Sequence, residues 1–236
     1  MTDDIIPRRK LHEEVAARLE ALILSDDYAV GDALPSEREL MERYGVGRPA
    51  VRQALLTLER MGLVKIASGE RARVTKPSPK VLTDTLGGVV RHILAEADGA
   101  RHFQMARLFF EAGLARWAAE HATDEDIARL RDALEANRAD LADVNAFNRT
   151  DVGFHYVLAV IPRNPIFVAL HEALVDWLTE QRTMSLLNPG AAQMAFDAHQ
   201  RIFDAIAARD PERAEAAMRA HLLEVSDLYW RGMGEQ

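Results

Sequence analysis

The segment Lys76-Pro77-Ser78-Pro79 divides the chain into two stretches of different character. Two prolines so close together lack two backbone N–H donors, so they cannot lie in the interior of a helix or a strand. Before this break, short helical patterns precede two β-like segments. After it, every periodic stretch is helical. We therefore expect a mainly α-helical chain of two domains, residues 1–77 and 78–236, with a hinge at residues 77–79.

The first domain begins with three helical patterns. Apolar residues recur at helical spacing from Arg8 to Ser25. Ser36 and Glu39 have the spacing of a capping box, which predicts the start of a second, short helix. A third helix is expected to start at Arg48-Pro49, because proline's missing N–H is harmless in the first turn.

A glycine-containing turn, residues 45–47, separates the second and third helices, and Gly62 ends the third. Residues 63–66 and 71–74 then flank Ser68-Gly69, which is typical of a β-hairpin. This order predicts a winged helix-turn-helix domain whose third helix enters the major groove of DNA. Arg48, Arg52 and Gln53 lie near the amino end of that helix, and basic residues such as Arg71 lie near the hairpin tip.

The distribution of charge agrees with one DNA-binding part. The net charge of −8 argues against nucleic-acid binding, but residues 35–76 contain 9 Lys/Arg and only 5 Asp/Glu. Any one of these arginines could instead be an ordinary solvent-exposed side chain that does not contact DNA.

The second domain is expected to contain helices alone, over residues 81–96, 102–121, 124–141, 146–160, 165–185, 191–208 and 211–233. The chain has no cysteine, so a transition metal would have to bind imidazole and carboxylate. Asp151 and His155 are four residues apart and share a helix face, while His199 and His221 lie on two later helices. Helices of a bundle can bring such side chains to one point, and the set suits zinc, nickel or cobalt. Taken singly, each histidine is more often a hydrogen-bonded core or surface residue than a metal ligand.

Several ordered motifs resemble the GntR family of regulators: Leu34-Pro-Ser-Glu-Arg-Glu-Leu, Arg48-Pro-Ala-Val-Arg52-Gln-Ala-Leu and the wing with Gly69. The resemblance implies that Arg38, Arg48, Arg52 and Gly69 contact operator DNA. The seven helices resemble the sensing domain of the FadR-type (FCD) branch of this family. Three stretches, around Asp151-Val-Gly-Phe-His155, His199 and His221, match the metal-binding segments of that branch.

The same resemblance implies an effector with a carboxylate, which can occupy an open coordination position of the metal. It makes Arg107 a candidate effector-binding residue, although an ion pair with Glu111, four residues on, is an equal alternative. Longer stretches, including Ile161-Pro-Arg-Asn-Pro-Ile-Phe167, are similar to sialic-acid-responsive members of the family and imply N-acetylneuraminate as the effector.

Together these observations predict a cytoplasmic, homodimeric repressor without a membrane segment, which holds one divalent ion per chain, zinc before nickel. Operator DNA and N-acetylneuraminate are the expected partners. Another sugar acid or small carboxylate is the first alternative. A metal-dependent hydrolase is a second alternative, since a histidine-bound ion can activate water. A helical module with a purely structural metal is a third alternative.

Overall fold

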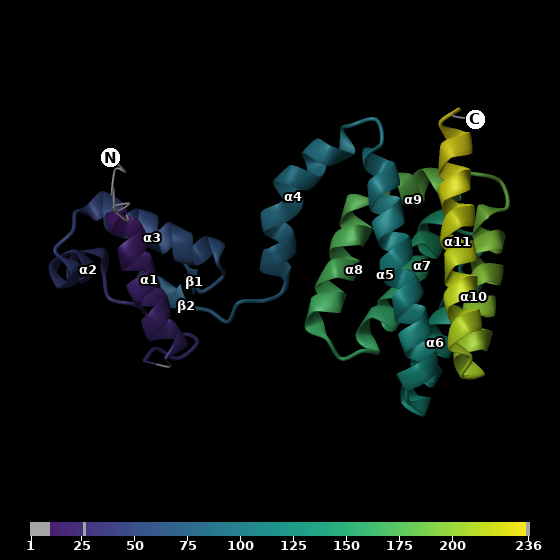
Figure 1. Ribbon diagram of the computed structural model, residues 1–236, viewed down its shortest axis with the longest axis horizontal. Coiled ribbons are helices and arrows are strands. Elements are labelled where there is room, and N and C mark those ends of the chain that lie inside the picture. Colours follow the sequence, from purple (N-terminus) through teal and green to yellow (C-terminus); the bar gives the residue numbers. More distant parts are fainter. Residues whose placement is uncertain (1–9, 26, 235–236) are drawn as a thin grey trace, which may run out of the picture. The chain divides into compact units, whose positions relative to one another are not determined.

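The computed structural model describes residues 10–25 and 27–234, and its regular elements are helices apart from one short hairpin (Figure 1). Contacts between Cα atoms separate two compact units, residues 1–85 and 86–236. A functional boundary at residues 77–78 stays a prediction. No helix in the described ranges is both long enough and apolar enough to cross a membrane.

Three helices and a hairpin build the first unit: α1 (Leu11–Leu24), α2 (Glu37–Tyr44), α3 (Arg48–Arg60), β1 (Val64–Lys65) and β2 (Arg73–Val74). The expected winged helix-turn-helix is present. The start of the first helix expected at Arg8 lies outside the described residues. The strands are shorter than expected, and they pair antiparallel with Val64 opposite Val74.

Local chemistry explains the turn between α2 and α3. Ser36 caps α2, and its capping box with Glu39 is complete. Gly45 ends the helix at a φ of 63°, a left-handed conformation that glycine adopts without a Cβ clash. Buried leucines and valines of α1, α2 and α3 form one core, among them Leu19, Leu40 and Val51.

The remaining helices are α4 (Lys80–Leu94), α5 (Gly99–His121), α6 (Asp124–Ala139), α7 (Val144–Val160), α8 (Pro165–Trp177), α9 (Thr179–Leu186), α10 (Ala191–Ala207) and α11 (Pro211–Gly232). Side chains of Thr123, Asn164 and Asp210 cap the helices expected to begin at residues 124, 165 and 211. In Figure 1, α5, α10 and α11 run side by side, and α11 packs against both of the others. Their common core includes Phe154, Ile202 and Met218.

The single helix expected over residues 165–185 is divided in two at Leu178. The carbonyl oxygen of Val175 accepts hydrogen bonds from the hydroxyl of Thr179, at 2.8 Å, and from the guanidinium of Arg182, at 3.3 Å. A threonine hydroxyl that bonds back to the carbonyl four residues earlier competes with the helical ladder and favours a bend. The break turns α9 so that Arg182 is buried.

Candidate functional site

The residues predicted to contact DNA are exposed on the first unit. Arg48, Arg52 and Gln53 lie in the first two turns of α3. The Nε atoms of Arg48 and Arg52 are each 3.5 Å from an oxygen of Glu37 on α2, so this carboxylate lies between the two guanidinium groups.

The other predicted DNA contacts are also accessible. Arg38 pairs with Glu42 at 3.2 Å and Arg71 approaches Glu39 to 3.9 Å, and both arginines remain more than half exposed. Gly69 has a φ of 77° at the tip of the hairpin, and a Cβ built there would meet nothing within 4 Å. Their contacts with DNA stay predictions, but nothing in the described part of the chain buries these groups.

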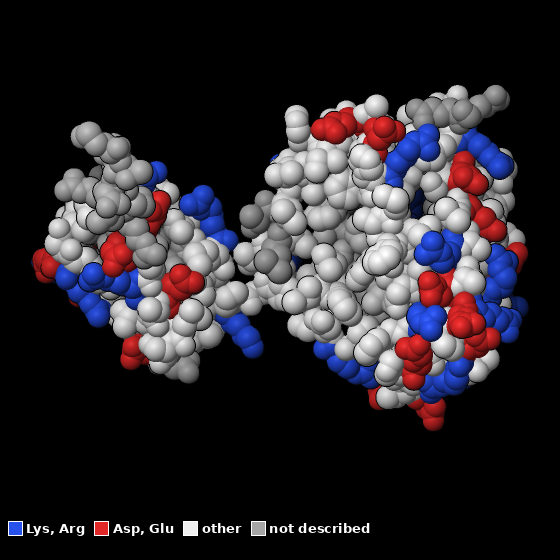
Figure 2. Space-filling view, in the orientation of Figure 1, with Lys and Arg blue, Asp and Glu red and all other residues white. Residues whose placement is uncertain are grey.

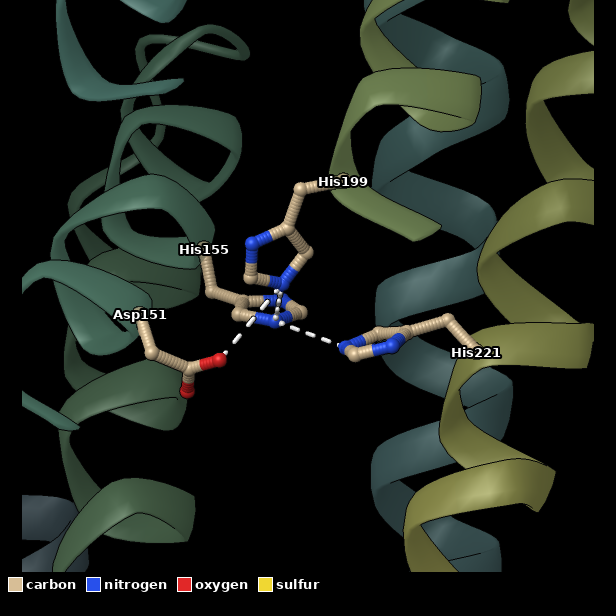
Figure 3. A group of neighbouring side chains, drawn as sticks. All are labelled: Asp151, His155, His199 and His221. Carbon is tan, nitrogen blue, oxygen red and sulfur yellow. Dashed lines mark hydrogen bonds and ion pairs between the residues drawn. The ribbon is translucent and has the colours of Figure 1, made fainter. Parts of the chain in front are cut away.

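The four predicted metal ligands come together in the core of the second unit (Figure 3). Asp151 and His155 extend from α7, His199 from α10 and His221 from α11. One possible ligand atom from each lies within 4.8 Å of the others, and all four side chains are buried. The Nε2 atom of His155 is 3.2 Å from that of His199 and 3.3 Å from that of His221.

Groups behind the histidines orient two of the rings. The Nδ1 atom of His199 lies 2.8 Å from the side-chain oxygen of Asn137 on α6, and Asn137 in turn donates to Thr150 at 3.2 Å. The Nδ1 atom of His155 faces the buried carboxylate of Glu111 on α5. Amide and carboxylate oxygens accept hydrogen bonds, so both rings carry the proton on Nδ1 and direct an Nε2 lone pair toward the cluster.

This arrangement fits a cation. Burial lowers the pKa of His199 and of His221 well below the ordinary value for histidine, so these rings are neutral. Lone pairs that face each other at 3.2 Å repel, unless a proton or a metal ion lies between them. Two nitrogen atoms bound tetrahedrally at about 2.05 Å from zinc are about 3.3 Å apart, close to the spacing found here.

Arg107 forms an ion pair with Glu111, which the sequence predicts as the alternative to effector binding. Its Nε donates to Glu111 at 2.7 Å, and both side chains are nearly buried. Burial alone would raise the pKa of Glu111, but the charge of Arg107 and the hydrogen bond from His155 outweigh it and hold that pKa well below its usual range. Burial also raises the pKa of Asp151, against the opposing charge of Arg107. Arg107 therefore neutralises the acid that orients His155.

Arg107 also lines a small cavity next to the four-residue cluster. Asp151 and His221 line it too, together with Arg182 and Ser185 of α9. A second cavity shares Arg107, Arg182 and Ser185. Each has about 20 Å³ of free volume, which is room for about one water molecule.

Sequence reasoning missed Arg182 and Asn137. Arg182 donates to Asn148 at 2.8 Å as well as to Val175, and only the break at Leu178 brings it to the cavity. Asn137 is 62 positions from His199 in the chain, so no local spacing could link them. Helical periodicity does not distinguish either residue from an ordinary polar one.

Comparison with known proteins agrees with both halves of the structure. Residues 11–74 match the bacterial regulatory proteins of the gntR family, and residues 103–224 match the FCD domain. The HTH-type transcriptional repressor NanR of Cronobacter sakazakii is 48% identical over 236 residues, which cover 98% of this chain and 89% of the relative. The repressor of the same name from Salmonella typhimurium is 47% identical over 234 residues, which cover 98% and 88%.

The solved structure of Streptococcus agalactiae GntR has a TM-score of 0.65 and 25% identity, and the match covers 92% of this chain and 99% of that one. The relatives carry the name of transcriptional repressors, which argues against the hydrolase alternative. The chain belongs to the GntR family of bacterial regulatory proteins, and its helix-turn-helix domain is joined to an FCD domain.

Proposed function

We propose that this chain is a homodimeric transcriptional repressor that leaves its operator when N-acetylneuraminate binds beside a metal ion in the FCD domain. The observation that carries the proposal is the buried convergence of Asp151 with the Nε2 atoms of three histidines. Unpaired buried acceptors of this kind are costly without a cation.

Asp151, His155, His199 and His221 would hold the ion. Three imidazoles and one carboxylate suit zinc first, with nickel or cobalt as other candidates. A bound ion of this class can accept a further oxygen ligand such as an effector carboxylate.

The cavity supports an acidic effector. Arg107 and Arg182 both line it, and guanidinium groups bind carboxylates in a bidentate manner. N-acetylneuraminate is the effector that the sequence resemblance implies. Its size exceeds a free volume of about 20 Å³. Binding therefore requires the walls to separate, and α9, which supplies Arg182 and Ser185 to both cavities, is the short element that would have to move.

The DNA-binding half acts through α3. Arg48, Arg52 and Gln53 would reach base edges or phosphates, and Arg38, Gly69 and Arg71 would contact the backbone beside them. Two copies related by a two-fold axis would place two α3 helices on half-sites one helical turn apart. An effector weakens operator binding only if it prefers the conformation that fits DNA poorly.

Fluorescence anisotropy tests this proposal. The protein is loaded with zinc and titrated onto a labelled operator, selected by the protein itself from random DNA, with and without N-acetylneuraminate. We expect the operator Kd to rise at least about fivefold, the lower end of typical coupling between sites. N-acetylmannosamine, which lacks the carboxylate, is the control and should have no effect.

The variant His155→Ala should bind the operator but not respond to the effector. An operator Kd unmoved by saturating N-acetylneuraminate would remove this effector, and a thermal-shift panel of other sugar acids would then identify the alternative. If a chelator unfolds the protein and no acid stabilises it, the metal is purely structural.

A further inference from the structure

The acidic side chains of α2 all lie beside arginines that are predicted to contact DNA. Residues 35–76 contain 5 Asp or Glu residues, and three of these are on α2: Glu37, Glu39 and Glu42. Glu42 pairs with Arg38 and Glu39 approaches Arg71, one acid to one base. Figure 2 shows basic and acidic side chains next to one another over α2. The surface that would face DNA is therefore of mixed charge, although neutralising phosphates requires clustered positive charge.

Glu37 differs from the other two acids because it lies between two arginines. Its Oε2 atom is 3.5 Å from Nε of Arg48, and its Oε1 atom is 3.5 Å from Nε of Arg52. The two arginines are four residues apart, so they share one face of α3. Each carboxylate oxygen therefore approaches one guanidinium group, and one of the two positive charges is neutralised.

The stability of the fold does not account for this arrangement. The side chains of Arg48 and Arg52 are 66% and 68% exposed. Ion pairs between exposed side chains contribute little to the free energy of unfolding, because water and salt screen them. An acid in the first turn of α2 favours the helix through its dipole, but Glu39 already supplies one in that turn. The position of Glu37 instead affects what the two arginines can bind.

A carboxylate in this position affects phosphates and bases differently. A DNA phosphate carries a negative charge, so Glu37 repels a phosphate that approaches the same two guanidinium groups. The edge of a guanine carries no net charge and offers two acceptors, N7 and O6, to an arginine. Because Glu37 contacts the Nε atoms, it leaves the two outer nitrogen atoms of each guanidinium group, Nη1 and Nη2, available to donate to a base.

We propose that Glu37 is a positioning residue that directs Arg48 and Arg52 to base edges in the major groove and away from phosphates. It restrains two long side chains before DNA binds, which lowers the entropy cost of ordering them in the complex. It also weakens binding to DNA of any sequence, because it cancels one positive charge of the binding surface. Both effects raise the ratio of specific to non-specific affinity, which decides whether a regulator finds its operator among competing sites.

This inference rests on the proposed role of α3 in DNA binding. Anisotropy titrations of the full chain use two labelled duplexes: the operator that the wild type selects from random DNA, and a scrambled duplex of the same composition. Glu37→Gln removes the charge and keeps the size of the side chain. We expect it to bind the scrambled duplex more tightly, with a slope of log Kd against log salt that is steeper by up to about 0.9. The ratio of the two affinities should fall at least about fivefold, the low end of what one bidentate arginine–guanine contact provides.

Glu42→Gln is the matched control, because it removes the same charge from the same helix but releases only Arg38. It should strengthen binding to both duplexes by a similar factor and leave their ratio unchanged. Glu37→Asp keeps the charge but is shorter by one carbon atom, so its oxygens should not reach both Nε atoms. It should bind the scrambled duplex like the wild type and still discriminate less between the two duplexes.

Three results would overturn the inference. If Glu37→Gln strengthens binding to both duplexes equally, or changes neither, Glu37 does not direct the arginines. If discrimination is lost at a single base pair and binding to the scrambled duplex is unchanged, Glu37 reads a base itself, since a carboxylate can accept a hydrogen bond from N4 of cytosine. If the wild type prefers no DNA sequence, the proposed repressor and the role of Glu37 are both wrong.

Discussion

Replacing Asn137 by leucine should weaken metal binding without touching a proposed ligand. Asn137 is fully buried, and its side-chain oxygen lies 2.8 Å from Nδ1 of His199. Leucine has a similar volume but no acceptor, so the ring loses the bond that sets its tautomer and orientation. Loss of such a supporting group costs about 10- to 100-fold in metal affinity, or about 1.4–2.7 kcal/mol.

The assay is competition for zinc between the protein and a coloured chelator, after circular dichroism has shown that the variant is folded. Thr150→Val is the control. It removes the hydroxyl that accepts a hydrogen bond from the side-chain amide of Asn137 at 3.2 Å, but it leaves in place the Asn137 oxygen that faces His199. We expect its zinc affinity to stay within about threefold of wild type, below the range for loss of a direct partner. Wild-type zinc affinity in folded Asn137→Leu would refute the reasoning.

Three further predictions concern the metal, the DNA and the fold. Zinc at 100 times its Kd should stabilise the wild type by about 2.7 kcal/mol in thermal unfolding, and His155→Ala should show no such gain. Arg52→Ala should weaken operator binding by about 1–3 kcal/mol in anisotropy titrations; a smaller salt dependence would indicate a phosphate contact, and an unchanged affinity would exclude the residue from the interface. Burial would raise the pKa of Asp126, but hydrogen bonds from Arg163 and Thr123 outweigh it and lower that pKa. The ionised carboxylate therefore stabilises the fold at neutral pH, and this contribution disappears as pH falls through the lowered pKa. Asp126→Asn should lose about 1–2 kcal/mol in denaturant unfolding at pH 7 and less near pH 3, and an equal loss at both would contradict the assignment.

Sequence patterns predict the parts of the fold that depend on neighbouring residues. The capping box of Ser36, the helix starts at residues 124 and 165, and the glycine turn after Tyr44 are confirmed, because each depends on two to four consecutive residues. The break at Leu178 was not predicted. It depends on burial of Arg182, whose partner Asn148 lies 34 positions away.

The candidate site divides in the same way. Spacing alone predicts that Asp151 and His155 lie on one face of α7. The resemblance to the family's metal-binding segments predicts His199 and His221 as further ligands. The groups behind them, Glu111 and Asn137, come from other helices and have no local signature. Tertiary packing alone reveals which acid and which amide orient the rings.

The central claim is that one metal ion binds among the four converging side chains. Crystals of protein grown with zinc, measured on both sides of the zinc absorption edge, test it most directly. The account predicts a single strong anomalous peak per chain, within about 2.2 Å of the three Nε2 atoms and of a carboxylate oxygen of Asp151. A crystal in which the four side chains are ordered but the peak is absent, or lies elsewhere, would contradict the account.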